Sequence, residues 1–164
     1  MKILFVCSSN ICRSPFCEYL LRRMAKEDKE LSQIIEKVSS AAVLNQSFKI
    51  HPKAVVALKR EGFSEEEIYA HKPRFKWCAW KDFKEADLII GMNNANRFFT
   101  PIQFKKKFQT LSFAATGEEV FIEDPWLMKD INDYLKVMDT IKNYLVLFVE
   151  KLKKTAQNIN WFIN

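Results

Sequence analysis

Apolar residues follow two alternating patterns along the chain: short runs that are typical of buried strands, and longer stretches with helical spacing. The strand-like runs are Ile3–Val6, Lys37–Val43, Ala86–Met92 and Phe108–Ala114. Apolar positions recur every three or four residues in Pro15–Lys26, His51–Gly62 and Lys129–Lys154, which predicts amphipathic helices. Asn94–Lys107 is weakly helical and is interrupted at Pro101. Because strands and helices alternate, we predict an α/β fold with a four-stranded parallel sheet flanked by helices on both faces.

The length and continuity of this pattern predict a single domain. The chain has 164 residues, of which 48% are hydrophobic, so it can bury a substantial core. We place the domain at residues 1–154 and a C-terminal tail at residues 155–164, and we expect Trp161, Phe162 and Ile163 of that tail to dock on the domain. Apolar stretches of bilayer-spanning length and a signal peptide are both missing from the pattern. We therefore expect a cytoplasmic protein with no membrane partner.

The link between the first strand and the first helix carries the main chemical signal. After Ile3–Val6 the chain reads Cys7-Ser8-Ser9-Asn10-Ile11-Cys12-Arg13-Ser14-Pro15. Ser14 followed by Pro15 predicts an N-cap and a first helical turn. The preceding loop then lies against a helix N-terminus, where unpaired backbone N–H groups and the helix dipole favour an anion. The sequence therefore predicts an anion-binding loop after the first strand.

The side chains of this loop suit a phosphoryl group. The helix N-terminus favours the thiolate form of Cys7, which is the nucleophilic form of cysteine. The guanidinium of Arg13 offers a planar pair of donors that matches two phosphate oxygens. We expect the Ser14 hydroxyl to hydrogen-bond the sulfur and Asn10 to adopt a left-handed conformation and tie the loop together through its amide. Small side chains at Ser8 and Ser9 leave the backbone amides accessible.

A second signal follows the fourth predicted strand. Ligands of parallel α/β sheets bind beyond the carboxyl ends of the strands, so residues 115–129 should lie near the Cys7 loop. This segment contains Glu123-Asp124-Pro125-Trp126. A carboxylic acid at Asp124 can protonate a departing ester oxygen, and Trp126 can form an aromatic wall beside a flat substrate. Asp124 is therefore the candidate proton donor.

The predictions for the other cysteines, Cys12, Cys17 and Cys78, are less specific. Three of the four cysteines crowd into one strand-to-helix unit, which is unsuitable for a disulfide framework and fits a reducing compartment. Cys12 either forms a reversible disulfide with Cys7 under peroxide or packs beneath the loop as a small apolar residue, and both interpretations stay open. We expect Cys17 and Cys78 to be core residues.

The two histidines, His51 and His71, lack the spacing of catalytic bases. We predict that they are loop or capping residues, and that His71 contacts the Cys7 loop from outside.

The formal net charge of +6 is compatible with an anionic ligand. Basic runs such as Lys105–Lys107 are typical of solvated surfaces, and their surroundings match no known nucleic-acid-binding module. We therefore expect no nucleic-acid partner. A modest positive field attracts anionic phosphoesters. We expect a monomer or a weak dimer.

From about Lys2 to Leu152 the chain resembles the low-molecular-weight protein tyrosine phosphatase family. The motifs that carry the resemblance are Cys7–Pro15, the Pro52 helix ending at Gly62, His71-Lys72-Pro73-Arg74, Ala86-Asp87-Leu88-Ile89 and Asp124-Pro125. The resemblance implies hydrolysis of phosphotyrosine in proteins and of small aryl phosphates through a phosphocysteine, without a metal or other cofactor. It implies that Cys7 is the nucleophile, Arg13 the phosphate ligand and Asp124 the general acid. Substrate-binding residues are then Ser8, Ser9, Asn10, Ile11, Cys12, Ser14 and Trp126.

Three positions depart from the family pattern. Ser9 stands where the family usually has glycine, and Asn93 follows Met92 where an aspartate is common. Leu127 follows Trp126 where the family often has a second aromatic residue. None of these changes removes a group that makes or breaks a bond, so we expect them to affect substrate preference.

Three further functions use a similar loop. Arsenate reductases that shuttle a disulfide need further downstream cysteines, and only Cys78 is present here. Protein-arginine phosphatases, by resemblance, favour threonine where this chain has Ile11. An inactive phosphopeptide-binding module would bind phosphate esters without turnover, and the retention of Cys7, Arg13 and Asp124 together argues against it.

Overall fold

The computed structural model describes the backbone of residues 1–163 and the side chains of residues 1–158. Its centre is a four-stranded sheet in the order β2-β1-β3-β4. The strands are β1 (Lys2–Cys7), β2 (Lys37–Ala42), β3 (Leu88–Gly91) and β4 (Phe108–Thr110). Each neighbouring pair is parallel, as the alternation of strands and helices predicted.

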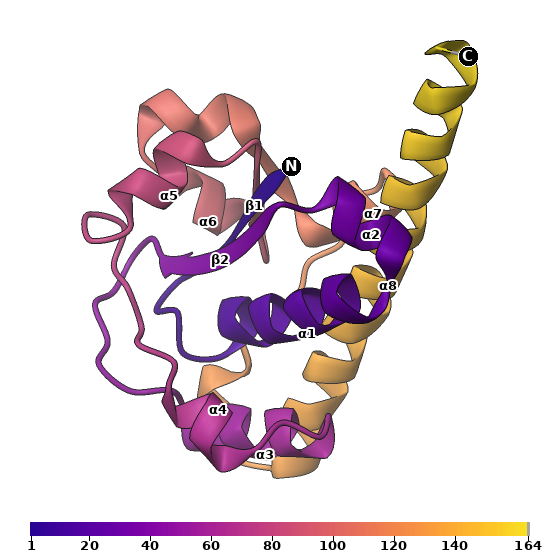
Figure 1. Cartoon of the computed structure of the whole chain (residues 1–164). Helices are drawn as coiled ribbons and strands as arrows, with labels where there is room; N and C mark the ends of the chain where they lie inside the picture. The colour runs from indigo at the N-terminus through magenta and orange to yellow at the C-terminus, as the bar shows by residue number, and fades with distance from the viewer. Residues whose placement is uncertain (164) are drawn as a thin grey trace.

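Helices connect the strands and form the outer layers (Figure 1). The α-helices are α1 (Arg13–Glu27), α2 (Lys29–Ile34), α3 (Pro52–Arg60), α4 (Glu65–Tyr69), α5 (Trp80–Glu85), α6 (Asn94–Phe99), α7 (Leu111–Thr116) and α8 (Ile131–Ile163). Two 3-10 helices are η1 (Ile102–Lys107) and η2 (Pro125–Leu127). Pro101 separates α6 from η1, so the predicted interruption of that segment is confirmed.

The two faces of the sheet bury two separate apolar clusters. Ile3 and Phe5 of β1 pack with residues of α1, α3, α7 and α8, whereas Leu4 and Val6 pack with residues of α5 and η1. This division follows from the strand geometry, because successive side chains point to opposite faces. Figure 1 shows α1 and α8 on one side of β1 and β2, and α5 and α6 on the other. The prediction of helices on both faces is therefore confirmed.

The predicted fourth strand, Phe108–Ala114, is wrong in its second half. The strand ends at Thr110, and Leu111 begins α7. The Thr110 hydroxyl accepts a hydrogen bond from the backbone N–H of Phe113 (3.3 Å), which is the contact of a helix N-cap. Leu111, Ala114 and Ala115 are buried at helical spacing. A short apolar run fits both the two-residue period of a strand and the 3.6-residue period of a helix. Here the Thr110 cap stabilises the helix.

The last helix is longer than its apolar stripe predicted. The helix α8 continues without a break from Ile131 to Ile163, so the predicted end at Lys154 is wrong. Lys153 pairs with Asp28 at 2.6 Å, and Gln157 donates to Glu30 at 2.6 Å, which holds this part of α8 against α2. The side chains of Trp161, Phe162 and Ile163, whose docking was predicted, lie outside the described residues. Within the described part of the chain, every helix is too short or too polar to cross a bilayer.

A close approach between β3 and β4 depends on Gly91. A Cβ added at Gly91 would lie 2.2 Å from Cζ and 2.6 Å from Cε2 of Phe108. We expect Gly91→Ala to lower the free energy of unfolding by about 1–3 kcal/mol, because the buried Phe108 ring must move. Urea unfolding of Gly91→Ala, Phe108→Leu and the double variant measures this. Since leucine lacks the clashing ring atoms, the double variant should lose less than the sum of the two single losses, and strict additivity would contradict the proposed clash.

Candidate active site

The loop between β1 and α1 wraps around the Cys7 sulfur. Cys7 is the last residue of β1 and is only 2% exposed. Asn10 has φ +56°, the left-handed conformation that the sequence predicted, and it is the one non-glycine residue with positive φ in the described backbone. This turn directs the backbone N–H of Asn10 to Cys7 Sγ at 3.3 Å. The sulfur therefore lies inside the turn of the loop.

The Ser14 hydroxyl lies 3.1 Å from Cys7 Sγ, which confirms the predicted contact. Its predicted role as helix N-cap is wrong, because α1 begins at Arg13 and Cys12 occupies the N-cap position without a side-chain hydrogen bond. The physical reason is competition: a hydroxyl bonded to the sulfur within the loop is directed away from the helix N–H groups. Ser14 belongs to the first turn of α1 and to the loop at once.

The Asn10 amide determines the direction of every hydrogen bond around it. Its Oδ1 accepts from the backbone N–H of Arg74 (2.9 Å), so Nδ2 is the donor to Ser14 Oγ (3.0 Å) and to Ser40 Oγ (2.7 Å). Ser14 Oγ accepts this bond, which leaves its own proton to donate to Cys7 Sγ. The sulfur thus accepts from an N–H and an O–H, an environment that suits a thiolate. The predicted tie through the Asn10 amide is confirmed.

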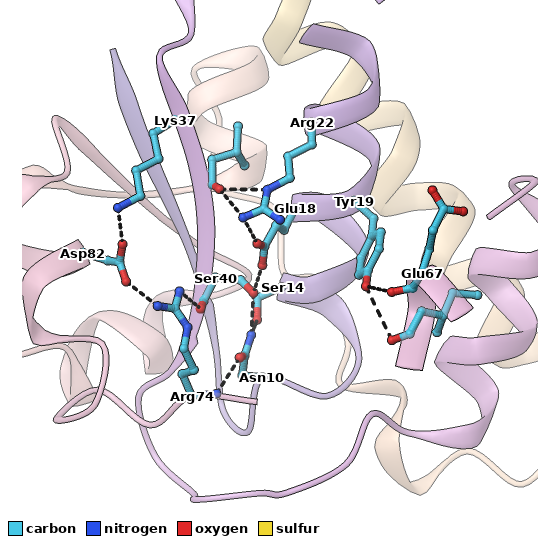
Figure 2. Close-up of polar contacts among 12 residues, drawn as sticks. Asn10, Ser14, Glu18, Tyr19, Arg22, Lys37, Ser40, Glu67, Arg74 and Asp82 are labelled. Atoms are coloured by element: carbon cyan, nitrogen blue, oxygen red, sulfur yellow. Dashed lines mark hydrogen bonds and ion pairs between the residues drawn. The ribbon is translucent and has the colours of Figure 1, made fainter. Parts of the chain in front are cut away.

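The network continues to a buried carboxylate in α1, as Figure 2 shows. Ser40 donates to Glu18 Oε2, and Arg22 pairs with Glu18 Oε1 at 2.5 Å. Glu18 is 6% exposed, so its charge requires these partners. Sequence reasoning missed Ser40 and Glu18. The available signals were a polar pair, Ser39-Ser40, in a buried strand and a glutamate on the apolar side of the first predicted helix.

His71 contacts the loop from outside, as predicted. Its Nε2 lies 3.0 Å from the carbonyl oxygen of Asn10, so this nitrogen carries the proton and donates. Burial lowers the pKa of His71, although the hydrogen bond to Asn10 opposes that effect. His51 caps α3, because its Nδ1 accepts from the backbone N–H of Lys53 at 3.2 Å. Both histidines therefore have the loop and capping positions that the sequence predicted.

Arg13 is buried beneath the mouth of the loop and faces Asp124. It is 1% exposed, and its Nη2 forms an ion pair with Asp124 Oδ2. Its Nε and Nη1 are also buried, and neither has a hydrogen-bond partner among the described residues. An unsatisfied buried donor costs about 1–3 kcal/mol, and more when it is charged. The fold therefore presents two N–H groups that an anion would satisfy.

These residues line one cleft of about 500 Å³. Its lining comprises Cys7, Ser8, Ser9, Ile11, Cys12, Arg13, Leu44, Asn45, Ser47, Asp124 and Trp126. The carboxylate of Asp124 is 45% exposed at the rim and accepts from the backbone N–H of Trp126 (3.2 Å). The predicted meeting of the Cys7 loop with the Asp124 segment is confirmed. Asn10 and Ser14, in contrast, are fully buried behind the loop and support it.

The other cysteines divide between the interior and the surface. Burial raises the pKa of Cys12 to about 12, so this residue is a neutral thiol at pH 7. Cys17 is fully buried, as predicted. The prediction for Cys78 is wrong, because this residue is exposed in the turn before α5. An apolar neighbourhood in the sequence, Trp77 to Trp80, does not ensure burial where the chain turns at the surface.

The departures from the family pattern have local structural explanations. The Ser9 hydroxyl accepts from Asn45 Nδ2 at 3.3 Å, which joins the loop to the segment after β2. Asn93 caps α6 by accepting from the backbone N–H of Asn96 at 3.2 Å. Leu127 is 78% exposed beside the cleft residue Trp126. All three therefore alter the surroundings of the loop and leave Cys7 and Arg13 in place.

The parallel α/β sheet, with Cys7 and the buried Arg13 in the loop after its first strand, fits the class of small cysteine-containing phosphatases that the sequence resembles. The profile of the family described as "Low molecular weight phosphotyrosine protein phosphatase" matches residues 2–158. The chain belongs to this family, which is a family of hydrolases.

Three relatives illustrate the match. The low molecular weight phosphotyrosine protein phosphatase of Sus scrofa is 27% identical over 158 residues, and the match covers 93% of this chain and 96% of the Sus scrofa protein. The protein-arginine-phosphatase of Bacillus subtilis (strain 168) is also 27% identical over 158 residues, and the match covers 94% of this chain and 98% of the Bacillus protein. A mutant of the YwlE arginine phosphatase with a phosphorylated active-site serine superposes with a TM-score of 0.79 at 28% identity, covering 94% of this chain and 97% of that chain.

An ion-pair cluster beside the loop generates a prediction of pH-dependent stability. Asp82 pairs with Lys37 at 2.7 Å and with Arg74 at 2.6 Å, and Arg74 is the residue whose backbone holds Asn10 (Figure 2). Burial pushes the pKa of Asp82 upward, but Lys37 and Arg74 outweigh it and hold the pKa below its usual value of 3.8. The stabilisation is therefore complete above about pH 5 and is lost as the pH falls through the lowered pKa.

We expect Asp82→Asn to lower the free energy of unfolding by about 2 kcal/mol at pH 7, since both cations are partly exposed and screened. The loss should be smaller at pH 3 than at pH 7, because at pH 3 the carboxyl of Asp82 is already mostly protonated in the unfolded chain. Urea unfolding at both pH values measures it, and Glu118→Gln, at an exposed position outside this ion-pair cluster, is the control. A pH-independent difference would contradict the ion-pair explanation.

Proposed function

We propose that this protein hydrolyses phosphotyrosine in proteins, and small aryl phosphates, through a phosphocysteine formed on Cys7. One observation carries the proposal. The Cys7 sulfur accepts two hydrogen bonds in the same cleft where buried N–H groups of Arg13 lack a partner and the Asp124 carboxylate faces inward. A nucleophile, an anion-binding group and a proton donor are what transfer of a phosphoryl group requires.

Substrate binding replaces one ion pair by another. A phosphate dianion seated over Cys7 offers its oxygens to the guanidinium of Arg13, whose fork matches two of them. The Asp124 carboxylate, which pairs with Arg13 here, is then released towards the leaving oxygen. A negative phosphate nearby favours the protonated form of that carboxyl. Phosphate binding therefore pairs Arg13 with the phosphate oxygens and leaves Asp124 protonated beside the leaving oxygen.

The first chemical step forms the bond between Cys7 sulfur and phosphorus and breaks the bond between phosphorus and the tyrosine oxygen. The leaving oxygen takes the electron pair and receives the proton of Asp124, so it departs as a neutral phenol. Charge that develops on the equatorial oxygens is stabilised by Arg13 and the backbone amides of the loop.

The second step hydrolyses the phosphocysteine. The Asp124 carboxylate takes a proton from a water molecule, whose oxygen attacks phosphorus, and inorganic phosphate is released. The Cys7 thiolate leaves with its electron pair and is stabilised by the Ser14 hydroxyl and the Asn10 N–H. The phosphorylated active-site serine in the YwlE mutant supports a phosphoryl-enzyme intermediate of this kind.

Removal of the proton donor tests the mechanism. We expect Asp124→Asn to lower kcat/KM on a phosphotyrosine peptide by roughly 10²- to 10⁴-fold, because the phenol must then leave as an anion. The loss should be smaller with p-nitrophenyl phosphate, whose leaving group is a weaker base. Steady-state kinetics with both substrates measure the two losses, and Asp130→Asn is the control.

Cys7→Ser should abolish turnover, and acid quench of the wild-type enzyme during turnover should trap a phosphorylated Cys7 peptide. Equal activity of Asp124→Asn and wild type on phosphotyrosine would remove Asp124 from the mechanism.

Phosphoarginine is the second candidate substrate, because one of the matching relatives is a protein-arginine-phosphatase. Ile11 lines the cleft, and its branched apolar side chain suits an aromatic ring better than a guanidinium, which needs polar partners. We expect the wild type to prefer phosphotyrosine peptides. We also expect Ile11→Thr to shift the ratio of kcat/KM values towards phosphoarginine by about tenfold. A wild-type preference for phosphoarginine would replace the proposed substrate without affecting the proposed intermediate.

Arsenate reduction and phosphopeptide binding without turnover have less support. Cys78, the one cysteine downstream of the first helix, is exposed and is absent from the cleft lining, which disfavours an arsenate reductase that shuttles a disulfide. A phosphopeptide-binding module would not require a sulfur that accepts two hydrogen bonds.

A further inference from the structure

Two segments of the chain, residues 71–81 and residues 88–117, combine exposed apolar residues with a one-sided charge. Neither residues 71–81 nor residues 88–117 contain an aspartate or glutamate, although both contain several lysines and arginines. Their most exposed large apolar side chains are Trp77 (61% exposed), Phe98 (74%) and Ile102 (81%). Such side chains are costly to leave in water when they gather in one place.

The two segments lie side by side. Lys76 Nζ donates to the carbonyl oxygen of Phe99 at 3.1 Å, and the rings of Trp80 and Phe104 meet edge to face at 5.1 Å. Figure 1 shows the neighbouring helices α5 and α6 together, on the side of β1 and β2 away from α1 and α8. The apolar and basic residues therefore form one surface.

We call this the aromatic-basic surface. Its members are Lys76, Trp77, Lys81, Phe98, Ile102 and Lys105. The cations lie beside the exposed rings: Lys76 Nζ is 5.5 Å from the Trp77 ring centroid, and Lys105 Nζ is 5.4 Å from that of Phe98. The Lys81 side chain is 83% exposed. Each exposed ring thus has a positive charge close to it.

We propose that the aromatic-basic surface docks the protein on an anionic lipid bilayer. Tryptophan and phenylalanine rings favour the headgroup region, and lysines extend from apolar surroundings to contact anionic headgroups. Neither segment contains an acidic residue, and although Glu85 of α5 lies 3.7 Å from Lys81, the three lysines of the surface outnumber it, which makes the surface complementary to such a membrane. Nucleic acid fits less well, because the most exposed apolar member, Ile102, cannot stack on a base and Trp77 is already stacked on Trp80.

The proposal concerns binding at the membrane surface. The expectation of no membrane partner rested on the lack of a spanning segment. That lack does not bear on binding at the membrane surface. None of the six residues lines the catalytic cleft. Bilayer binding therefore goes beyond the proposed phosphatase activity and is testable apart from it.

Co-sedimentation of the full chain with vesicles tests the proposal. We expect binding to vesicles of phosphatidylcholine with about 30 mol% phosphatidylserine at about 0.1 M salt, and at least tenfold weaker binding to phosphatidylcholine alone. Salt at about 0.5 M should weaken the binding by screening. The apolar variant Trp77→Ala/Phe98→Ala/Ile102→Ser and the charge variant Lys81→Glu/Lys105→Glu should each bind at least tenfold more weakly.

Matched controls separate docking from general effects. Phe121 is 74% exposed and Lys136 has a 76% exposed side chain, and both lie outside the surface, so Phe121→Ala and Lys136→Glu should bind as wild type does. Hydrolysis of soluble p-nitrophenyl phosphate by every variant should match wild type, which shows that each is folded.

Three results would overturn the proposal: no binding to anionic vesicles at low salt, equal losses in the control variants, or tighter binding to a single-stranded oligonucleotide than to vesicles. The last result would assign the surface to nucleic acid instead.

Discussion

The left-handed turn at Asn10, held by its side-chain amide, is the constraint on which the site depends. The positive φ folds the loop so that a backbone N–H reaches the Cys7 sulfur, and the amide then bonds to Ser14, Ser40 and the Arg74 backbone. Each such bond is worth about 1 kcal/mol, which together offset the strain of a left-handed non-glycine residue. Because the Arg74 bond orients the amide, the Ser14 proton is directed to the sulfur.

The second constraint is electrostatic. Arg13 is buried with only one of its terminal groups paired, and its partner Asp124 is half-exposed at the rim. A buried guanidinium with unpaired donors is costly, and this cost supports the proposed binding of a phosphate at Arg13. The same ion pair positions Asp124 over the cleft. In the proposed mechanism, binding of the anion and placement of the proton donor are therefore coupled through one guanidinium.

Local sequence reasoning was correct where one short segment determines the outcome. The strand before Cys7, the left-handed Asn10, the Ser14 contact and the His51 cap all depend on residues within a few positions. It was wrong where two local structures compete. The apolar run after Phe108 is compatible with a strand and with a helix, and it forms a helix from Leu111. Ser14 can cap a helix or contact the sulfur, and it contacts the sulfur. Cys78 can lie in the core or in a surface turn, and it is exposed.

The sequence by itself determined the α/β alternation, the loop with Cys7 and Arg13 as a candidate anion site, and Asp124 as the candidate acid, because strand period, helix-start residues and side-chain chemistry are local properties. Only the tertiary structure decided which distant residues complete the site. Ser40 of β2 and the backbone of Arg74 reach Asn10, and Ser40 in turn donates to Glu18 of α1. Parallel pairing of β1 with β2 aligns Phe5 with Ser40 and so places Ser40 there, a register that no local pattern encodes. The tertiary structure also brought together the two segments of the aromatic-basic surface, since contacts between distant segments arise only when the helices pack on the sheet.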